Sequence, residues 1–162
     1  MSFGIGYGFE VLGVHTGFPF GNYSYGPVLG FQLFEVPLLI GVNWLLLVYV
    51  CGEIFHNRIK NDFLAAGLGS LLMVLLDVLI EPVAVKLDFW SWENEVIPLS
   101  NFIGWFGIAF IILLGFHALH FYKAYQENKV IQQKIIAGTA NAKFESLKNQ
   151  IDPHFLFNSL NV

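Results

Sequence analysis

The sequence predicts an all-α protein: a polytopic transmembrane bundle of three full spans plus an N-terminal remnant, followed by a cytoplasmic amphipathic or coiled-coil helix. Three observations lead to this prediction. Apolar residues make up 56% of the 162-residue chain and charged residues only 12%, whereas a soluble domain carries about 25% charged residues. Three stretches are long and apolar enough to cross a bilayer, which takes about 20 residues. The composition then changes sharply after Tyr122.

The N-terminal part is expected to contain a short helical segment and a loop. Met1–Phe9 is apolar but too short to span a bilayer, so it is interpreted as the end of a further helix, as if the chain began late. His15–Pro27 is rich in Gly, Pro, Asn, Ser and Tyr, a composition that favours turns. No basic region precedes the apolar start, which does not fit a cleavable signal peptide.

The three predicted spans cover Val28–Ile54, Phe63–Val85 and Asn101–Tyr122. The second span contains only Asp77 and Glu81 as charged residues, and the third contains no Asp, Glu, Lys or Arg. Glycines in the second and third spans provide small surfaces at which helices can approach closely. These glycines are Gly67, Gly69, Gly104 and Gly107.

The charges in the loops predict the orientation in the membrane. The loop after the first span carries Arg58 and Lys60, and the tail after the third span begins with Lys123, whereas the loop 86–100 is mainly acidic. The positive-inside rule therefore places the C-terminal tail in the cytoplasm. We expect a multi-pass protein of the inner (plasma) membrane with the bilayer as its main partner.

Several functional classes are disfavoured by composition. The net charge of −4 comes without a basic patch, so no nucleic-acid partner is expected. Cys51 is the only cysteine, which excludes an internal disulfide and a cysteine metal cluster. His117 and His120 are better explained by an interfacial position than by metal binding. No cofactor and no metal site is predicted.

Polar residues inside the predicted spans are the candidate functional groups. Glu35, Asp77 and Glu81 fall within these spans, and a carboxylate in hydrocarbon is costly unless it faces the bundle interior. Asp77 and Glu81 share one helix face, and an apolar site favours the neutral form of one of them. Glu10 and Asn43 could join the same interior. The alternative interpretation is that these groups only hydrogen-bond between helices and hold the bundle together.

The segment 123–162 alternates charged and apolar residues and is predicted to be helical. Its apolar residues recur at near-helical spacing. They are Val130, Ile131, Ile135, Phe144, Leu147 and Ile151. We expect this helix to pair with a second copy of the chain and form a homodimer.

Four segments carry a resemblance to a known family: GFEVLGVHTGFPFGNYSYGPVLG (8–30), VPLLIGVNW (36–44), DVLIEPVAVKLDFWSW (77–92) and NFIGWF (101–106). Gly8–Phe116 resembles the carotenoid biosynthesis membrane proteins, which include carotenoid 1,2-hydratases and bisanhydrobacterioruberin hydratases. The resemblance implies addition of water to the terminal double bond of an acyclic carotenoid, which gives a tertiary alcohol.

That chemistry needs a buried acid, a base that positions water and aromatic faces that stabilise a carbocation. We infer the acid/base candidates to be Glu10, Glu35, Asp77 and Glu81. The substrate-binding candidates are Asn43, Trp44, Trp90 and Trp92.

A second resemblance begins near Gln133 and is sharpest at SLKNQIDPHFLFNSLN (146–161). This segment resembles the phosphoacceptor box of the internal-region class of sensor histidine kinases. The resemblance implies that His154 is the phosphorylated histidine. A response regulator would be a partner only if a full kinase were restored.

The two resemblances predict two regions. Residues 1–122 are expected to be a hydratase-like transmembrane domain, truncated at its start. Residues 123–162 are expected to be a linker helix and the beginning of a kinase dimerisation region, truncated at its end. Three interpretations remain open at this stage: a carotenoid hydratase, the membrane sensor of a two-component phosphorelay, and an inactive fusion of both.

Overall fold

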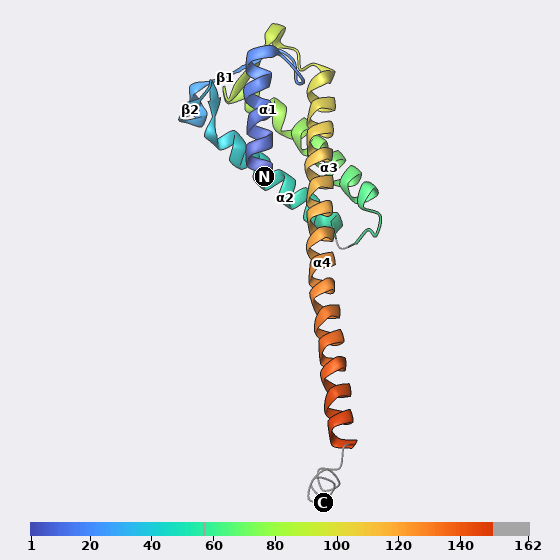
Figure 1. The fold of residues 1–162 in the computed structure, drawn as a ribbon. Helices are drawn as coiled ribbons and strands as arrows, with labels where there is room; N and C mark the ends of the chain where they lie inside the picture. Colours follow the sequence, from blue (N-terminus) through green and yellow to red (C-terminus); the bar gives the residue numbers. More distant parts are fainter. Residues whose placement is uncertain (57, 151–162) are drawn as a thin grey trace, which may run out of the picture. The chain divides into compact units, whose positions relative to one another are not determined.

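The computed structural model describes residues 1–56 and 58–150, and these are mainly helical (Figure 1). Four α-helices occur in the described residues: α1 (Ser2–Thr16), α2 (Leu38–His56), α3 (Asp62–Lys86) and α4 (Leu99–Gln150). The predicted helical fold class is confirmed. The chain divides into two compact units, Met1–Ala118 and a second unit that begins at Leu119; α4 contributes to both.

The described residues contain three helices that are long and apolar enough to cross a membrane, namely α2, α3 and α4. This agrees with the predicted number of spans. The beginning of the first span differs from the prediction, because α2 starts at Leu38 and not at Val28. At the start of α3, the Asn61 side chain accepts a hydrogen bond from the Leu64 amide at 3.1 Å, which satisfies one of the free N–H groups of the first turn.

Short strands connect the helices, and the sequence analysis did not predict them. β1 (Tyr23–Tyr25) pairs antiparallel with β4 (Trp90–Trp92), and β2 (Gln32–Leu33) pairs with β3 (Val36–Pro37). Two short 3-10 helices, η1 (Pro27–Leu29) and η2 (Glu93–Glu95), complete these connections. The β1–β4 ribbon joins the loop after α1 to the loop after α3.

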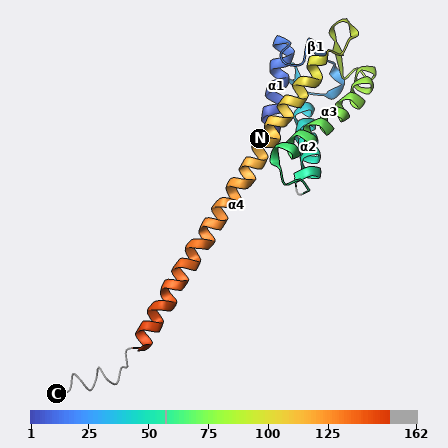
Figure 2. The ribbon, with the colours of Figure 1, turned by 90° about the vertical axis from the view of Figure 1, so that its right-hand side faces the viewer.

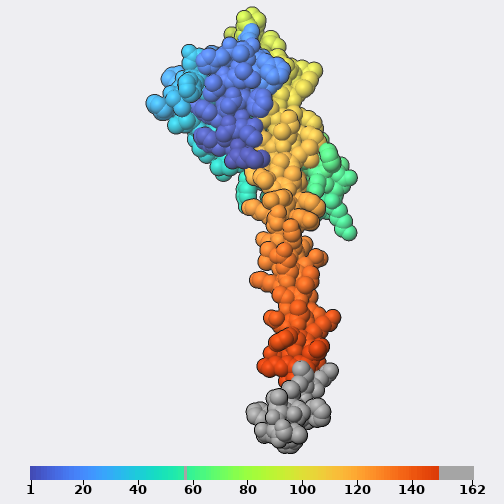
Figure 3. All heavy atoms as spheres, viewed as in Figure 1, coloured from blue at the N-terminus to red at the C-terminus, as the bar shows by residue number. Residues whose placement is uncertain are grey.

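Glycines let the first helices approach one another closely. A Cβ atom at Gly6 of α1 would lie 2.4 Å from Cγ of Trp44 on α2. A Cβ atom at Gly69 of α3 would lie 3.2 Å from the Cys51 carbonyl oxygen. Figures 2 and 3 show α1 lying beside the N-terminal part of α4 in the first unit. Small residues at these crossings are typical of membrane helices.

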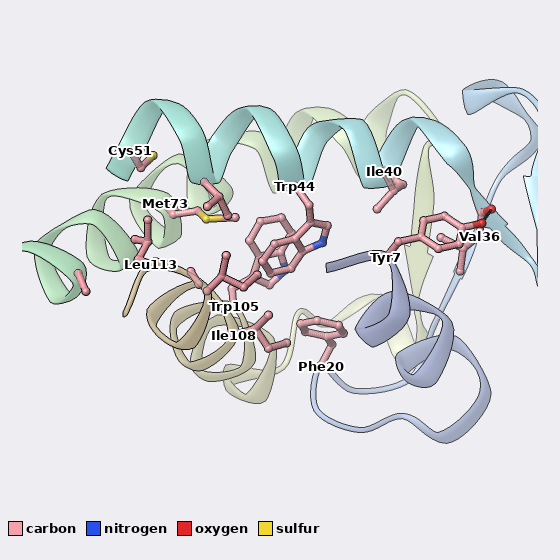
Figure 4. Packing of buried hydrophobic residues seen from close by; sticks show 14 of the residues in the cluster. Tyr7, Phe20, Val36, Ile40, Trp44, Cys51, Met73, Trp105, Ile108 and Leu113 are labelled. Atoms are coloured by element: carbon pink, nitrogen blue, oxygen red, sulfur yellow. Dashed lines mark hydrogen bonds between the residues drawn. The ribbon is translucent and has the colours of Figure 1, made fainter. Parts of the chain in front are cut away.

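The core of the first unit is built on aromatic rings (Figure 4). The rings of Trp44 and Trp105 are stacked, with centroids 4.3 Å apart and planes inclined by 15°. Phe20 reaches this core from the loop after α1, and Ser100 of α4 donates a hydrogen bond to its carbonyl oxygen at 3.0 Å. Cys51 is fully buried in the same core.

The described part of the second unit is helical from Leu119 to Gln150. Its predicted apolar residues up to Leu147 are exposed in the single chain. Lys148 and Glu145 form an i,i+3 ion pair at 3.7 Å. Ile151 and the predicted phosphoacceptor His154 lie outside the described residues, and homodimer formation stays a prediction.

Candidate functional site

Three carboxyl side chains are buried in the first unit. Glu10 lies on α1, and Asp77 and Glu81 lie one turn apart on α3; each is 2–3% exposed. Asn101, at the start of α4, is 2% exposed and lies next to the α3 pair. The three carboxyls line one cavity, so residues far apart in the sequence form a single polar centre inside an apolar bundle.

Glu10 accepts hydrogen bonds from three aromatic side chains. Oε1 accepts from the Trp44 indole at 2.8 Å, and Oε2 accepts from the hydroxyls of Tyr23 at 2.5 Å and Tyr25 at 2.7 Å. Gly13, one turn after Glu10, leaves room for this arrangement, since a Cβ atom there would lie 2.7 Å from the Tyr23 hydroxyl. The Glu10 carboxyl is therefore held in one orientation by neutral donors.

Glu81 and Asp77 are connected by Asn101. Oε2 of Glu81 accepts from the indoles of Trp90 and Trp92, both at 3.0 Å. The Asn101 amide donates to Asp77 Oδ2 at 3.0 Å and to Glu81 Oε1 at 3.2 Å. Asp77 thus accepts one of these hydrogen bonds, whereas Glu10 and Glu81 accept three each.

The β1–β4 ribbon places four of the aromatic donors. Successive residues of a strand point to opposite faces, so Tyr23, Tyr25, Trp90 and Trp92 lie on the inner face while Ser24 and Ser91 are exposed. The ribbon continues through a hydrogen bond from the Gly26 amide to the Phe89 carbonyl at 2.9 Å. Only glycine fits at position 26, where a Cβ atom would lie 2.1 Å from the Asp88 carbonyl oxygen.

The two tyrosines of the ribbon remain proton donors at neutral pH. Burial, together with the charge of the Glu10 carboxylate, raises the pKa of the Tyr23 hydroxyl. The same two causes raise the pKa of Tyr25 well above its usual value. Both hydroxyls therefore donate to Glu10 and do not compete with it for negative charge.

The cavity between the carboxyls is small. The volume open to the centres of water molecules is about 30 Å³, and one water needs roughly 10–15 Å³ by the same measure. Glu10, Asp77, Glu81 and Asn101 supply polar groups, and the remaining lining is mainly apolar or aromatic. It includes Phe20, Ile40, Asn43, Ile80 and Trp105. The cavity can therefore hold one or two water molecules against the carboxyls.

No basic side chain neutralises this centre within the part of the chain that the structure describes. The ion pairs found there are His15 with Glu35, His117 with Asp62 and Lys148 with Glu145. Residues 1–56 and 58–150 also contain no group of three or more His, Cys, Asp or Glu residues that could hold a metal ion. The described contacts to the three buried carboxyls are hydrogen bonds from neutral side chains.

The structure separates the predicted site residues into two groups. It brings together Glu10, Asn43, Asp77, Glu81, Trp90 and Trp92 around the cavity, with Trp44 bonded to Glu10. Glu35 is elsewhere: it occupies the turn between β2 and β3, its side chain is 74% exposed, and its nearest ionic partner is His15 at 3.9 Å. The prediction that Glu35 lies inside a span was wrong, because the preceding residues form a hairpin and not a helix.

Sequence reasoning missed four members of the site. Tyr23 and Tyr25 were considered only as part of a loop, and their alternation around Ser24 was the available signal for a strand. Asn101 marked the start of a span but was not recognised as a partner of Asp77. Trp105 falls within the third predicted span but was not named as a site residue, and it is buried against Trp44.

Comparison with known proteins adds the family. The sequence matches the model of the carotenoid biosynthesis protein family over residues 1–145. The chain belongs to this family. A relative from Haloarcula japonica, bisanhydrobacterioruberin hydratase, is 29% identical over 125 residues, which cover 68% of this chain and 41% of the relative. The chain thus spans about two fifths of the length of that relative.

Two further comparisons concern solved structures and the C-terminal segment. No solved structure matches this carotenoid biosynthesis protein. A short match to the histidine kinase family covers residues 142–162, a range that lies largely outside the described residues.

Proposed function

We propose that the first unit contains a carotenoid hydratase site. In this site a buried carboxylic acid donates a proton, and water adds to the terminal double bond of an acyclic carotenoid end. The observation that carries the proposal is the convergence of Glu10, Asp77 and Glu81 on one cavity that has room for water. The family membership and the hydratase relative support the same chemistry.

The reaction has two balanced steps. An acid transfers its proton to the less substituted carbon of the trisubstituted alkene, so that the neighbouring carbon becomes a tertiary carbocation and the acid becomes a carboxylate. A water oxygen then bonds to the cation, and a second carboxylate accepts the proton that this water loses. One molecule of water is consumed, and the product is a tertiary alcohol.

Asp77 is assigned the role of the acid. A carboxylate is stabilised by each N–H or O–H donor that it accepts, and Asp77 accepts from Asn101 alone, whereas Glu10 and Glu81 accept from three donors each. Asp77 is therefore the group that most readily carries a proton. Glu81, one turn along α3, is the base in this assignment, and Glu10 adds negative charge that favours the cation.

The aromatic lining stabilises the carbocation. Trp90, Trp92 and Trp105 line the cavity, and an aromatic face attracts a cation by about 2 kcal/mol or more when both are removed from water. The cavity is too small for an isoprenoid end group as it stands. Binding therefore requires side chains at its margin to move, and Ile80 and Asn43 are only partly buried.

Expression in cells that accumulate lycopene or γ-carotene tests the proposal. Membranes containing the chain are expected to yield a carotenoid that has gained the mass of one water molecule. Asp77→Asn keeps the size of the side chain and its contact with Asn101 but cannot supply the proton, and is expected to abolish the product. Hydration that persists at full rate in Asp77→Asn would contradict the assignment of the acid.

Carotenoid binding gives a second readout that does not need turnover. A polyene held against Trp90, Trp92 and Trp105 is expected to quench their fluorescence in both the unmodified chain and Asp77→Asn. Absence of quenching in both would argue against a carotenoid site in this unit.

A second candidate function rests on the histidine kinase match at 142–162. We propose that residues 123–162 are the beginning of a kinase dimerisation region on the cytoplasmic side of the plasma membrane, with His154 as phosphoacceptor. Incubation with labelled ATP and an intact related kinase is expected to transfer the labelled phosphoryl group to the unmodified chain but not to the His154→Gln variant. Equal labelling of both would exclude this role. A response regulator would become a partner only through a complete kinase.

A further inference from the structure

A second hollow lies on the outer face of the β1–β4 ribbon. Its lining residues are Asn22, Tyr23, Ser24, Ser91, Trp92 and Glu93. It is open to the surroundings and larger than the inner cavity, with about 260 Å³ accessible to water centres. Within the hollow, Asn22 donates to Glu93 at 2.6 Å, and the hydroxyls of Ser24 and Ser91 lie 3.2 Å apart. These side chains provide hydrogen-bond donors and acceptors that can bind water.

The same two residues line the outer hollow and the inner cavity. Tyr23 and Trp92 are direct cross-strand partners, and their ring centroids are 5.1 Å apart. Their polar ends point inward, since Tyr23 donates to Glu10 and Trp92 donates to Glu81. A single layer, the Tyr23–Trp92 pair, therefore separates the outer hollow from the carboxyls.

Apart from the carboxyls, Asn43 and Asn101, the other walls of the inner cavity are apolar or aromatic. Ile40 on α2 and Ile80 on α3 belong to helices that are apolar enough to cross a membrane. Phe20 and Trp105 close the side towards the core. Water moving through a protein needs polar partners along its path. The ribbon is the wall that has polar groups facing both the inner cavity and the outer hollow.

We propose that the outer hollow is the water-binding vestibule of the buried site, and that the Tyr23–Trp92 pair is the gate through which water reaches Glu10, Asp77 and Glu81. This inference rests on the proposed function, because hydration consumes one water molecule per product and the inner cavity holds only one or two. The vestibule supplies water from the aqueous side while the substrate stays on the apolar side.

Hydrogen–deuterium exchange of the indole N–H groups tests the route without any carotenoid. The full chain, labelled with 15N-tryptophan and placed in lipid nanodiscs, has four indole signals. Trp92 bonds Glu81 and Trp44 bonds Glu10, and both are buried, so their indole protons exchange when water enters the cavity. Substitution of each tryptophan by phenylalanine assigns the signals.

Ser91→Phe fills the vestibule from its outer face without touching the carboxyls. It is expected to slow the exchange of the Trp92 and Trp44 indoles by about tenfold or more, while unchanged positions of the Trp44 and Trp105 signals show an intact fold. Ser91→Ala is the matched control that removes the hydroxyl without adding bulk. Leu79→Phe adds bulk on the exposed apolar side of α3. Leu79→Phe is expected to exchange like the unmodified chain, and Ser91→Ala is expected to slow exchange much less than Ser91→Phe.

Ser24→Phe provides an independent variant in case Ser91→Phe does not fold. The proposal would be overturned if neither Ser91→Phe nor Ser24→Phe changed the exchange rate. It would also be overturned if only Leu79→Phe slowed exchange, or if the unmodified chain showed no exchange. Because the readout needs no turnover, the vestibule can fail while the hydratase proposal stands. Failure of the hydratase proposal alone would be seen differently: the filling variants would slow indole exchange, but the unmodified chain would make no hydrated carotenoid.

Discussion

Asp77 and Glu81 share one hydrogen-bond donor. Both lie on the buried face of α3, and the Asn101 amide donates to Asp77 at 3.0 Å and to Glu81 at 3.2 Å. Asn101 of α4 thus connects the two carboxyls of α3 into one hydrogen-bonded polar centre. This relationship makes Asn101 a residue on which both the stability and the chemistry of the site depend.

Asn101→Leu is expected to destabilise the bundle, because it leaves two buried carboxyls without their shared donor. Asp77 loses the hydrogen bond from Asn101, and a buried polar group left unsatisfied costs about 1–3 kcal/mol. Glu81 keeps its hydrogen bonds from Trp90 and Trp92. Thermal unfolding in detergent, followed by circular dichroism, measures the loss. Ser100→Ala, one residue earlier, removes only the bond to the Phe20 carbonyl and is expected to have a smaller effect. A fully stable Asn101→Leu would contradict the role of the amide.

Gly6→Ala is expected to disturb the crossing of α1 and α2. Its Cβ atom would overlap the Trp44 ring at 2.4 Å, and overpacking of this kind costs about 1–3 kcal/mol. Gly8→Ala is the matched control, since it lies two residues along the same helix with nothing within 4 Å of its Cβ position. Gly8→Ala is expected to be neutral or stabilising, because alanine favours a helix by about 1 kcal/mol over glycine. Equal unfolding temperatures for the two variants would refute the close crossing.

Tyr7→Phe is expected to loosen the β2–β3 hairpin. The Tyr7 hydroxyl lies 2.7 Å from the Leu33 carbonyl oxygen and 2.8 Å from the Val36 carbonyl oxygen, so it pins both strands to α1. Loss of a hydrogen bond of this kind costs about 0.5–1.5 kcal/mol. Amide exchange across the hairpin is expected to accelerate while exchange in α3 stays unchanged. Acceleration in both regions would indicate a global and not a local effect.

The tyrosines of the ribbon predict how stability depends on pH. The pKa values of Tyr23 and Tyr25 are raised above the usual 10.0 in the folded chain. Below about pH 10 both hydroxyls are neutral in the folded and unfolded states, so their contribution is fully present. Above that pH the unfolded chain loses protons that the folded chain keeps, and stability falls as the pH rises.

The double variant Tyr23→Phe with Tyr25→Phe is expected to lose less stability between pH 9 and pH 11, a pH range set by the usual tyrosine pKa of about 10. An identical pH profile would contradict burial of the two hydroxyls.

Much of the fold could be predicted from local pattern. Three apolar stretches indicated α2, α3 and the first part of α4, because a helix long enough to cross a bilayer requires a run of that length. The i,i+4 spacing of Asp77 and Glu81 correctly placed both on one helix face. Glu35 shows the limit: its position within an apolar run indicated a span, but Phe34 and Glu35 adopt positive φ angles in a turn, which local hydropathy does not reveal.

The sequence by itself determined the apolar composition that favours a lipid bilayer and the number of long apolar helices. It also determined the presence of carboxyls that must be shielded from lipid. The tertiary structure alone decided which carboxyls meet and what surrounds them. Glu10 and Glu81 are 71 residues apart in the chain, and their donors come from a ribbon that pairs Tyr23–Tyr25 with Trp90–Trp92. Periodicity reports only which face of one element is apolar, whereas a site made from six elements depends on how those faces pack.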